Sequence, residues 1–385
     1  MQRSNLFIIL FLIFTCSNTI AQNIRVGLFS KQIVTDIQIS IQNGKYLLKT
    51  DNLIVDTLKS GENLSLQLIN QQFHCHLNDT IYSTDSIFSL ISLNTNTSFF
   101  INHSNSGSKA RCYEEDLIIL YSNERLTIIN KIDLEKYVSA VVEAEAGYNK
   151  PIEYYKSQAI ICRTYAVSHL NRHIAEGFDL CDKVHCQVYP YKSMTPEIRD
   201  AAFSTENLIL VDSSYNPILA TYHSNSGGQT ASSENVWISP VSYLKSIVDS
   251  ASINGKNYLW QKKISLVEWK QFFNKYGISQ ELSSDKYLIS EATRNKTVLI
   301  NNTPVPLSKI RSFFNLRSAF FHTTLDGENI IIHGKGYGHG VGLSQEGAMF
   351  MAINGTTYDK ILKFYYKDVH IVKLQTVNAI QNSFK

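Results

Sequence analysis

The chain contains the run GKGYGHGVGLSQEGA at residues 334–348, in which glycine occupies every second position from Gly334 to Gly342. Alternate glycines leave one face of an extended segment without side chains and tolerate positive φ, so another backbone or a flat ligand can approach closely. The imidazole of His339 is expected to project from this segment, which we call the glycine ribbon. Ser344 can cap the helix that follows and bring its free amides near His339. The ribbon therefore predicts one wall of a binding site, with a tightly packed, ligand-free hairpin as the alternative.

The N-terminus has the composition of a secretory signal. Arg3 precedes an apolar run at residues 6–15, and cleavage is expected after Ala21. Lipidation at Cys16 is less favoured, because Thr15 before it is larger than the small residue that such sites prefer. No later segment reaches the roughly 20 apolar residues that span a bilayer. We therefore expect an exported protein of the periplasm or cell envelope, with no transmembrane helix in the mature chain.

Composition excludes one class of partner and limits the cysteine chemistry. The net charge is +3, and lysine and arginine are scattered, which argues against a nucleic-acid partner. Of the 6 cysteines all but Cys16 lie in the mature chain, so an odd number remains and at least one thiol stays free in an oxidising compartment. Cys162 is expected to be a buried thiol on an apolar helix face, and a Cys75–Cys112 disulfide is left open.

The order of predicted elements indicates an α+β fold, with mainly antiparallel strands around a helical hairpin and a β-rich N-terminal region at residues 22–130. In that region strands are expected at residues 24–28, 37–41, 46–48, 64–68 and 117–120. The second domain, residues 131–385, is expected to carry the chemistry. Its later elements are expected to be strands at residues 208–211, 217–222 and 330–332 and helices at residues 266–275 and 358–366.

Two helices are predicted to form the hairpin. Asp133 suits the N-cap of the first helix, because apolar residues recur after it at steps of three and four. Pro151 suits the first position of the second helix, which is expected to run to about His173. Farther along the chain, the turn-rich loop at residues 223–228 presents hydroxyls and free amides together.

Glu145 is the candidate general acid. It falls on the apolar stripe of the first helix, whereas Glu143 points away from that stripe and is expected in solvent. A buried carboxylic acid loses hydration, so its pKa rises and it can donate a proton near neutral pH. The alternative is a structural ion pair of Glu145 with Arg163 or Lys150.

A group of thiols and imidazoles forms a candidate metal site. Cys181, His185 and Cys186 lie within six residues, with His173 upstream, and thiolates and imidazoles are the ligands that zinc prefers. The neighbours His185 and Cys186 can bind one ion only if the backbone bends, so three of the four residues are expected to hold zinc, together with another ligand or water. A Cys181–Cys186 disulfide is the alternative.

Several segments in the same order resemble the stage II sporulation protein D / LytB domain family. They lie at residues 137–145, 155–166, 181–189 and 222–230, at Trp237 and in the glycine ribbon through Gln345. The match covers about residues 131–371. The resemblance implies a peptidoglycan lytic transglycosylase, which cuts glycan between N-acetylmuramic acid and N-acetylglucosamine and leaves a 1,6-anhydromuramoyl end. Glu145 falls at the family's catalytic glutamate, and no second carboxylate is needed because the substrate supplies the nucleophile.

The resemblance also implies ligand and substrate residues. It matches the family's zinc cluster to Cys181, His185 and Cys186, with His173 as the upstream histidine by position, and we expect that zinc to be structural. One departure from the family is Ala146-Gly147 after the catalytic acid, where relatives usually carry Met-Pro; it bears on the pose of Glu145. The expected saccharide-binding residues are Gln187, Tyr189, Tyr222, Ser224, Ser226, Gly227, His339, Ser344 and Gln345.

Three other functions are left open by the sequence. Some family members are described as amidase enhancers, which stimulate a separate N-acetylmuramoyl-L-alanine amidase of the cell wall. A non-catalytic peptidoglycan-binding module would use the same tyrosine and glycine walls, with Glu145 as a structural acid. A zinc hydrolase of the wall peptide would need an open coordination position on the metal. The expected partners are peptidoglycan glycan strands and, for an enhancer, the amidase.

Overall fold

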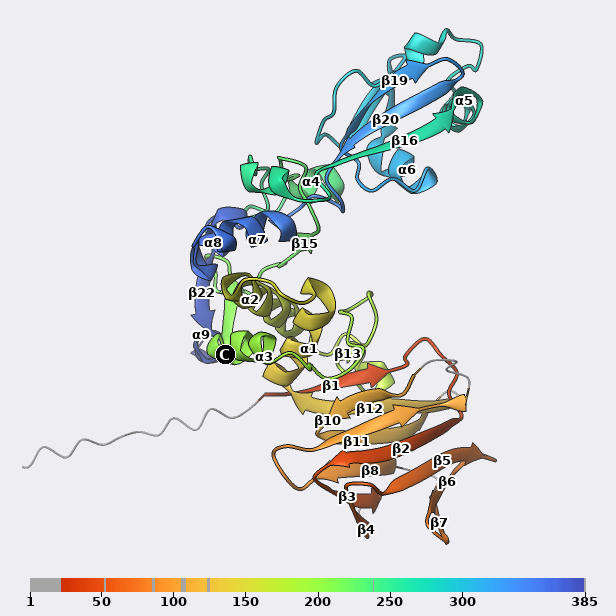
Figure 1. Ribbon diagram of the computed structural model, residues 1–385, viewed down its shortest axis with the longest axis vertical. Helices are drawn as coiled ribbons and strands as arrows, with labels where there is room; N and C mark the ends of the chain where they lie inside the picture. The colour runs from red at the N-terminus through yellow and green to blue at the C-terminus, as the bar shows by residue number, and fades with distance from the viewer. Residues whose placement is uncertain are drawn as a thin grey trace, which may run out of the picture.

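The computed structural model describes residues 22–51, 53–84, 87–104, 109–122, 125–237 and 239–383, so the predicted secretory signal lies outside the described residues. Figure 1 shows antiparallel sheets of the N-terminal region at one end, helices in the middle and a smaller α+β unit at the other end. The predicted α+β class with mainly antiparallel strands is confirmed. Within the described ranges, no helix combines the length and apolar character needed to cross a membrane.

The N-terminal region forms two sheets that share one hydrophobic core. The strand order is β13-β1-β12-β11-β8-β3-β4 in one sheet and β10-β9-β2-β5-β6-β7 in the other, and each predicted strand is present. β13, Leu180–Cys181, comes from later in the chain and joins the edge of the first sheet. Cys75 and Cys112 are free thiols on β6 and β10, with three strands between them. The bounds are β1 Asn23–Leu28, β2 Asp36–Asn43, β3 Lys45–Thr50, β4 Leu53–Lys59, β5 Asn63–Ile69, β6 Gln72–Leu77, β7 Thr80–Thr84, β8 Ile87–Ser92, β9 Ser98–Asn102, β10 Arg111–Glu114, β11 Asp116–Ser122 and β12 Arg125–Asp133.

The predicted helical hairpin follows directly. Helix α1, Leu134–Ala146, has Asp133 as its N-cap, whose carboxylate accepts hydrogen bonds from two backbone amides. Helix α2, Ile152–Ser168, packs against α1 and ends earlier than the predicted His173. The chain turns instead because Asn171 adopts a φ of 65°, which a right-handed helix cannot contain. This turn leaves His173 free of the helix.

The segments after the helical hairpin include a short strand that pairs with the segment directly after the glycine ribbon. Of the strand predicted at 217–222, only Tyr222 lies in a named strand, β15 (Tyr222–His223), and Pro217 forms an isolated bridge with Val211. β15 runs parallel to β21, which follows the ribbon. The remaining bounds are η2 Ile174–Glu176, β13 Leu180–Cys181, α3 Pro196–Ser204, β14 Leu208–Val211, α4 Ser233–Val236, η3 Ser250–Asn254, β21 Leu343–Ser344, α7 Gln345–Ile353, α8 Tyr358–Tyr365, β22 His370–Lys373 and α9 Leu374–Ser383.

Residues 259–335 form a unit with its own hydrophobic core, a division that the sequence analysis did not make. In Figure 1 this unit extends away from the helices, at the end opposite the N-terminal sheets. β16 and β20 pair along their whole length and connect it to the rest of the chain. Its elements are β16 Leu259–Ser265, α5 Leu266–Asn274, η4 Ser284–Tyr287, β17 Thr297–Ile300, β18 Thr303–Pro306, α6 Leu307–Phe313, β19 Phe321–Asp326 and β20 Asn329–Lys335.

The glycine ribbon is not a continuous extended strand. β20 ends at Lys335, and the alternate glycines Gly336, Gly338, Gly340 and Gly342 have positive φ. The ribbon packs on the loop at residues 223–228, where backbone groups of Asn225 and Tyr337 exchange hydrogen bonds of 3.1 and 2.8 Å. The glycines are therefore needed both for backbone conformation and for close approach of two chains.

Gly342→Ala is expected to destabilise the fold far more than Gly277→Ala. The two glycines have φ values of 72° and 76°, so both substitutions strain the backbone by roughly 1–2 kcal/mol. A Cβ at Gly342 would also lie 2.1 Å from the backbone oxygen of Thr221, whereas one at Gly277 meets nothing within 4 Å. Urea unfolding of both variants measures the difference. Equal losses of stability would contradict the close-packing role of the ribbon.

Candidate active site

Glu145 lies on the last turn of α1 and is half-buried. Burial raises the pKa of this carboxyl, while hydrogen bonds from the Val188 backbone and the Tyr222 hydroxyl partly oppose that rise. The predicted direction of the pKa change is thus confirmed. Arg163 is not its partner, because that guanidinium pairs with Glu135. Glu145 is therefore a carboxyl that can hold a proton at higher pH than an ordinary glutamate.

Glu143 is buried, so the prediction that it faces solvent is wrong. Helix α3 packs against this side of α1. One carboxylate oxygen of Glu143 accepts hydrogen bonds from the Ser193 hydroxyl at 2.7 Å and from the amides of Met194 and Thr195 at 2.9 and 3.0 Å. Glu143 thus fixes the segment that precedes α3.

A cavity of about 320 Å³ opens beside Glu145, and we call it the Glu145 cavity. The predicted residues Ser224 and Gln345 line it, and the amide of Gln345 donates to the Glu145 backbone oxygen at 3.3 Å. This bond ties the start of α7 to the end of α1. The complete lining is Glu145, Ala146, Gly147, Tyr148, Lys150, Tyr154, Ser224, Lys256, Asn257, Gln345, Glu346 and Met349.

Tyr154 and Glu346 are among the lining side chains of this cavity that the sequence analysis did not predict. The Tyr154 hydroxyl is buried and has no hydrogen-bond partner in the described part of the chain. Glu346 supplies a second carboxylate, which accepts bonds from Asn225 Nδ2 at 2.7 Å and from Asn257 Nδ2 at 2.6 Å. The sequence did offer one signal for Glu346, because this residue directly follows the predicted site residues Ser344 and Gln345. The cavity therefore offers a second carboxylate, held in place by two asparagine side chains.

Several predicted substrate residues do not line the Glu145 cavity and instead make structural contacts near it. Ser226 and Ser344 are fully buried; the Ser226 hydroxyl donates to Asp249 at 2.7 Å, and Ser344 accepts from the Gly347 amide as the predicted N-cap. A Cβ at Gly227 would lie 2.7 Å from the Lys335 backbone. These residues hold the ribbon and the 223–228 loop together.

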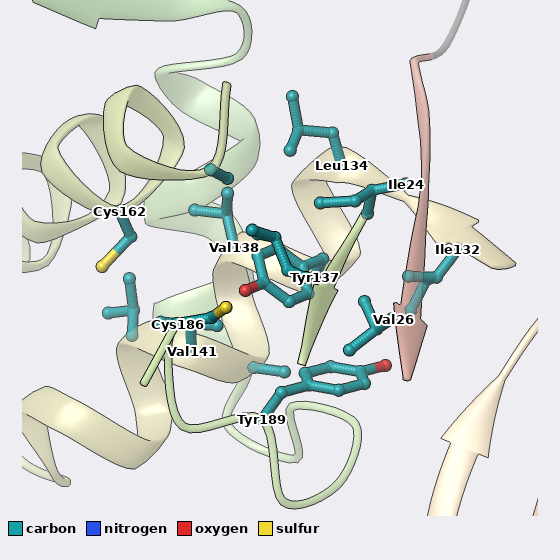
Figure 2. Close-up of a cluster of buried hydrophobic side chains, with 14 of the residues drawn as sticks. Ile24, Val26, Ile132, Leu134, Tyr137, Val138, Val141, Cys162, Cys186 and Tyr189 are labelled. Atoms are coloured by element: carbon teal, nitrogen blue, oxygen red, sulfur yellow. The ribbon is translucent and has the colours of Figure 1, made fainter. Parts of the chain in front are cut away.

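Gln187 and Tyr189 are buried core residues and do not line the Glu145 cavity. The Tyr189 hydroxyl donates to Asn130 at 2.7 Å, and Gln187 accepts from the Tyr137 hydroxyl at 3.2 Å. Figure 2 shows Tyr189 beside Tyr137, in the cluster that also contains Cys186. His339 lies elsewhere too, between the rings of His223 and Trp237 at centroid distances of 5.5 Å.

The four predicted metal ligands come together. One ligand atom from each of His173, Cys181, His185 and Cys186 lies within 4.8 Å of the other three. The Sγ atom of Cys186 is 3.4 Å from His173 Nε2 and 3.7 Å from His185 Nδ1, and Cys181 Sγ is 3.9 Å from His185 Nδ1. A tetrahedral zinc site has ligand atoms about 3.5–3.8 Å apart. The donor set and its spacing therefore fit zinc.

The surroundings of the cluster resemble those of a bound metal. Both cysteines are free thiols, so the alternative Cys181–Cys186 disulfide is not formed. A turn, closed by a 2.9 Å bond from the Cys186 amide to the Lys183 oxygen, supplies the bent backbone that adjacent ligands require. The other ring nitrogen of His173 lies 2.5 Å from Glu176, the type of carboxylate contact that orients metal-binding histidines.

The cluster is connected to the candidate acid through the backbone. β13 carries Cys181 and pairs with β1. The buried carboxylate of Asp182 accepts hydrogen bonds from the Phe29 amide at 3.1 Å and from Arg111 at 3.2 Å. Two residues beyond Cys186, the Val188 backbone contacts Glu145. A rigid cluster would thus fix the position of the Val188 backbone, whose hydrogen bond lowers the pKa of Glu145.

Comparison with known proteins supports the resemblance drawn from the sequence. The family model described as "Stage II sporulation protein" matches residues 122–211. Stage II sporulation protein D of Bacillus subtilis (strain 168) is 33% identical over 264 residues, which cover 63% of this chain and 75% of that protein. An uncharacterised protein of Brachyspira hyodysenteriae is 31% identical, with 69% of this chain and 74% of that protein covered. An amidase enhancer of Bacillus subtilis is 27% identical, with 60% and 39% covered.

Proposed function

Because the chain belongs to the stage II sporulation protein D / LytB family, we propose that it acts on the cell wall as a peptidoglycan lytic transglycosylase. The observation that carries this proposal is the half-buried Glu145, whose raised pKa suits a general acid, at the wall of a cavity that Glu346 also lines. Export to the periplasm or envelope through the N-terminal signal would bring the protein to this substrate.

The proposed reaction needs one protonatable carboxyl. Protonated Glu145 donates its proton to the glycosidic oxygen, the bond from that oxygen to C1 of N-acetylmuramic acid breaks, and an oxocarbenium-like transition state forms. The Glu145 carboxylate then takes the proton of the muramic acid 6-hydroxyl as that oxygen bonds to C1. No water is consumed, and the product end is a 1,6-anhydro sugar. The fixed charge of Glu346 favours the positive transition state.

The second candidate function is stimulation of a cell-wall amidase, which the similarity to an amidase enhancer favours. The test incubates the protein lacking residues 1–21 with intact and peptide-stripped glycan strands, alone and with an N-acetylmuramoyl-L-alanine amidase. New glycan ends without the amidase support the transglycosylase. Faster release of stem peptides, with no new glycan ends, would instead support the enhancer.

The pH dependence of cleavage should depend on Tyr222. The Tyr222 hydroxyl stabilises the Glu145 carboxylate and lowers its pKa, so Tyr222→Phe raises that pKa. Since the acid must be protonated to react, cleavage falls as pH rises through the Glu145 pKa, and this fall should move to higher pH in the variant. Initial rates between pH 4 and 9 measure the change, with Tyr215→Phe as the control. An unmoved profile, or a shift to lower pH, would exclude Glu145 as the acid.

We further propose that His173, Cys181, His185 and Cys186 hold one zinc ion. Bound zinc would supply a structural cross-link, since four protein ligands complete a tetrahedral shell. The purified protein is expected to contain about one zinc per chain by mass spectrometry, and Cys181→Ser should lose most of it. Cys162→Ala, which removes a buried thiol outside the cluster, should retain it. A metal-free wild-type protein that melts at the same temperature with and without added zinc would refute the site.

A further inference from the structure

A second cavity, of about 50 Å³, lies where the ribbon meets the unit of residues 259–335, and it shares no lining residue with the Glu145 cavity. We call it the arginine cavity. Arg294, Lys296 and Arg311 line it from the unit, and His339 lines it from the ribbon. No aspartate or glutamate is among its lining residues. The lining is thus cationic without an opposing charge.

The cationic side chains of this cavity are bound only to neutral groups. Arg294 Nε donates to the Gln229 oxygen at 2.9 Å, and its Nη2 donates to the Ser226 oxygen. Arg311 Nε donates to the Leu316 oxygen at 3.3 Å. Across the described ranges, neither arginine forms an ion pair. A guanidinium has five N–H donors, so both arginines keep donors for a ligand.

The electrostatics around the two arginines are unfavourable without an anion. Burial and the charge of Arg311 lower the pKa of Arg294 to about 9. Burial is the main cause that lowers the pKa of His339 to about 4, and the positive charges of Arg311 and Arg294 act in the same direction. This imidazole is therefore neutral near pH 7. Arg294 and Arg311 are half-buried, and like charges that lose hydration are costly unless a counter-charge accompanies them. The cavity therefore favours entry of a negative group.

The ribbon is shaped around this cavity. A Cβ at Gly340 would lie 2.5 Å from Arg294 Nη1, and Gly340 has a φ of 87°. The guanidinium carbon of Arg294 lies over the Phe320 ring, 4.3 Å from its centroid. Arg294 is therefore held in one position by the ribbon, by two backbone carbonyls and by an aromatic ring. Such preorganisation reduces the entropy lost when an anion binds.

We propose that the arginine cavity binds a small oxyanion, a carboxylate or phosphate group, between Arg294 and Arg311. Guanidinium groups match the planar or tetrahedral oxygens of such groups with paired hydrogen bonds. The bound group would lie where the unit of residues 259–335 meets the ribbon, because His339 of the ribbon also lines the cavity. Free phosphate and the anionic groups of a wall polymer share this chemistry.

The test titrates acetate and phosphate separately into the full chain at constant ionic strength, set with potassium chloride. Both a saturable rise in melting temperature and shifts of the His339 ring resonances are expected, with one anion preferred over the other. Arg311→Gln should weaken binding at least about tenfold. Arg317→Gln, an arginine of the same unit outside the cavity lining, should leave it unchanged.

The proposal is overturned if the wild-type His339 resonances do not move with either anion, or if Arg311→Gln binds as tightly as wild type. The resonance measurement needs no variant, so it decides the case even where Arg311→Gln does not fold. Preference for acetate points to carboxylates of wall peptides, and preference for phosphate points to phosphate-bearing polymers or free phosphate. Because no glycan is cleaved in this test, its result is independent of the proposed transglycosylase.

Discussion

Glu145→Gln is expected to lower the rate of glycan cleavage by roughly 10²–10⁴-fold, the usual contribution of a general acid. Glutamine keeps the size of the side chain and its contact with Tyr222 but cannot transfer the proton. The Glu145 backbone oxygen still accepts from Gln345, so the cavity is retained. Glycan binding should therefore survive while cleavage is lost.

The measurement compares initial cleavage rates and glycan affinity for the wild type, Glu145→Gln and Glu197→Gln. Glu197 is an exposed glutamate on α3 outside the Glu145 cavity, and its replacement should change neither quantity. If Glu145→Gln cleaves at the wild-type rate, the acid lies elsewhere. Glu346, the other carboxylate of the cavity, would then be the next residue to replace.

Arg163→Met is expected to lower the free energy of unfolding by about 3–5 kcal/mol, because it leaves a buried carboxylate without its partner. Arg163 and Glu135 are 0% and 3% exposed. Arg163 Nε lies 2.8 Å from Glu135 Oε1, and the guanidinium also donates to the backbone oxygens of Leu208 and Ala202 at 3.0 Å. The pair thereby joins both hairpin helices to α3 and β14.

Urea unfolding of Arg163→Met and of Lys263→Met tests this expectation. Lys263 pairs with Asp326 at 3.1 Å, but their side chains are 57% and 63% exposed, so its loss should cost less than about 1 kcal/mol. The double variant Glu135→Leu/Arg163→Met should recover part of the stability, since no charge is then buried alone. A loss below about 1 kcal/mol for Arg163→Met would show that the pair is not important for the fold.

Local patterns in the sequence predicted the parts of the site that depend on near neighbours. Helical spacing placed Glu145 toward the protein interior, and the close spacing of Cys181, His185 and Cys186 pointed to one cluster. The N-caps Asp133 and Ser344 were also predicted and are confirmed. Each of these features is set by residues a few positions apart, which is the distance over which periodicity is informative.

Features set by distant contacts could not be predicted in the same way. Glu143 is buried because residues 193–195 fold onto the far side of α1, and helical periodicity does not show that a helix is covered on two sides. Gln187 and Tyr189 have polar groups typical of a sugar site, yet Asn130 and Tyr137 use those groups in the core. The separate core of residues 259–335 likewise depends on tertiary packing rather than on local composition.

The most direct test of the central claim is cleavage of glycan strands in water enriched in ¹⁸O, followed by mass spectrometry of the new ends. A lytic transglycosylase that uses Glu145 should give 1,6-anhydromuramic ends without ¹⁸O, because the muramic acid 6-hydroxyl is the nucleophile. Glu145→Gln should give none. New reducing ends that carry ¹⁸O would contradict the account and indicate a hydrolase, and an absence of new ends with wild-type protein would contradict it in favour of the amidase enhancer.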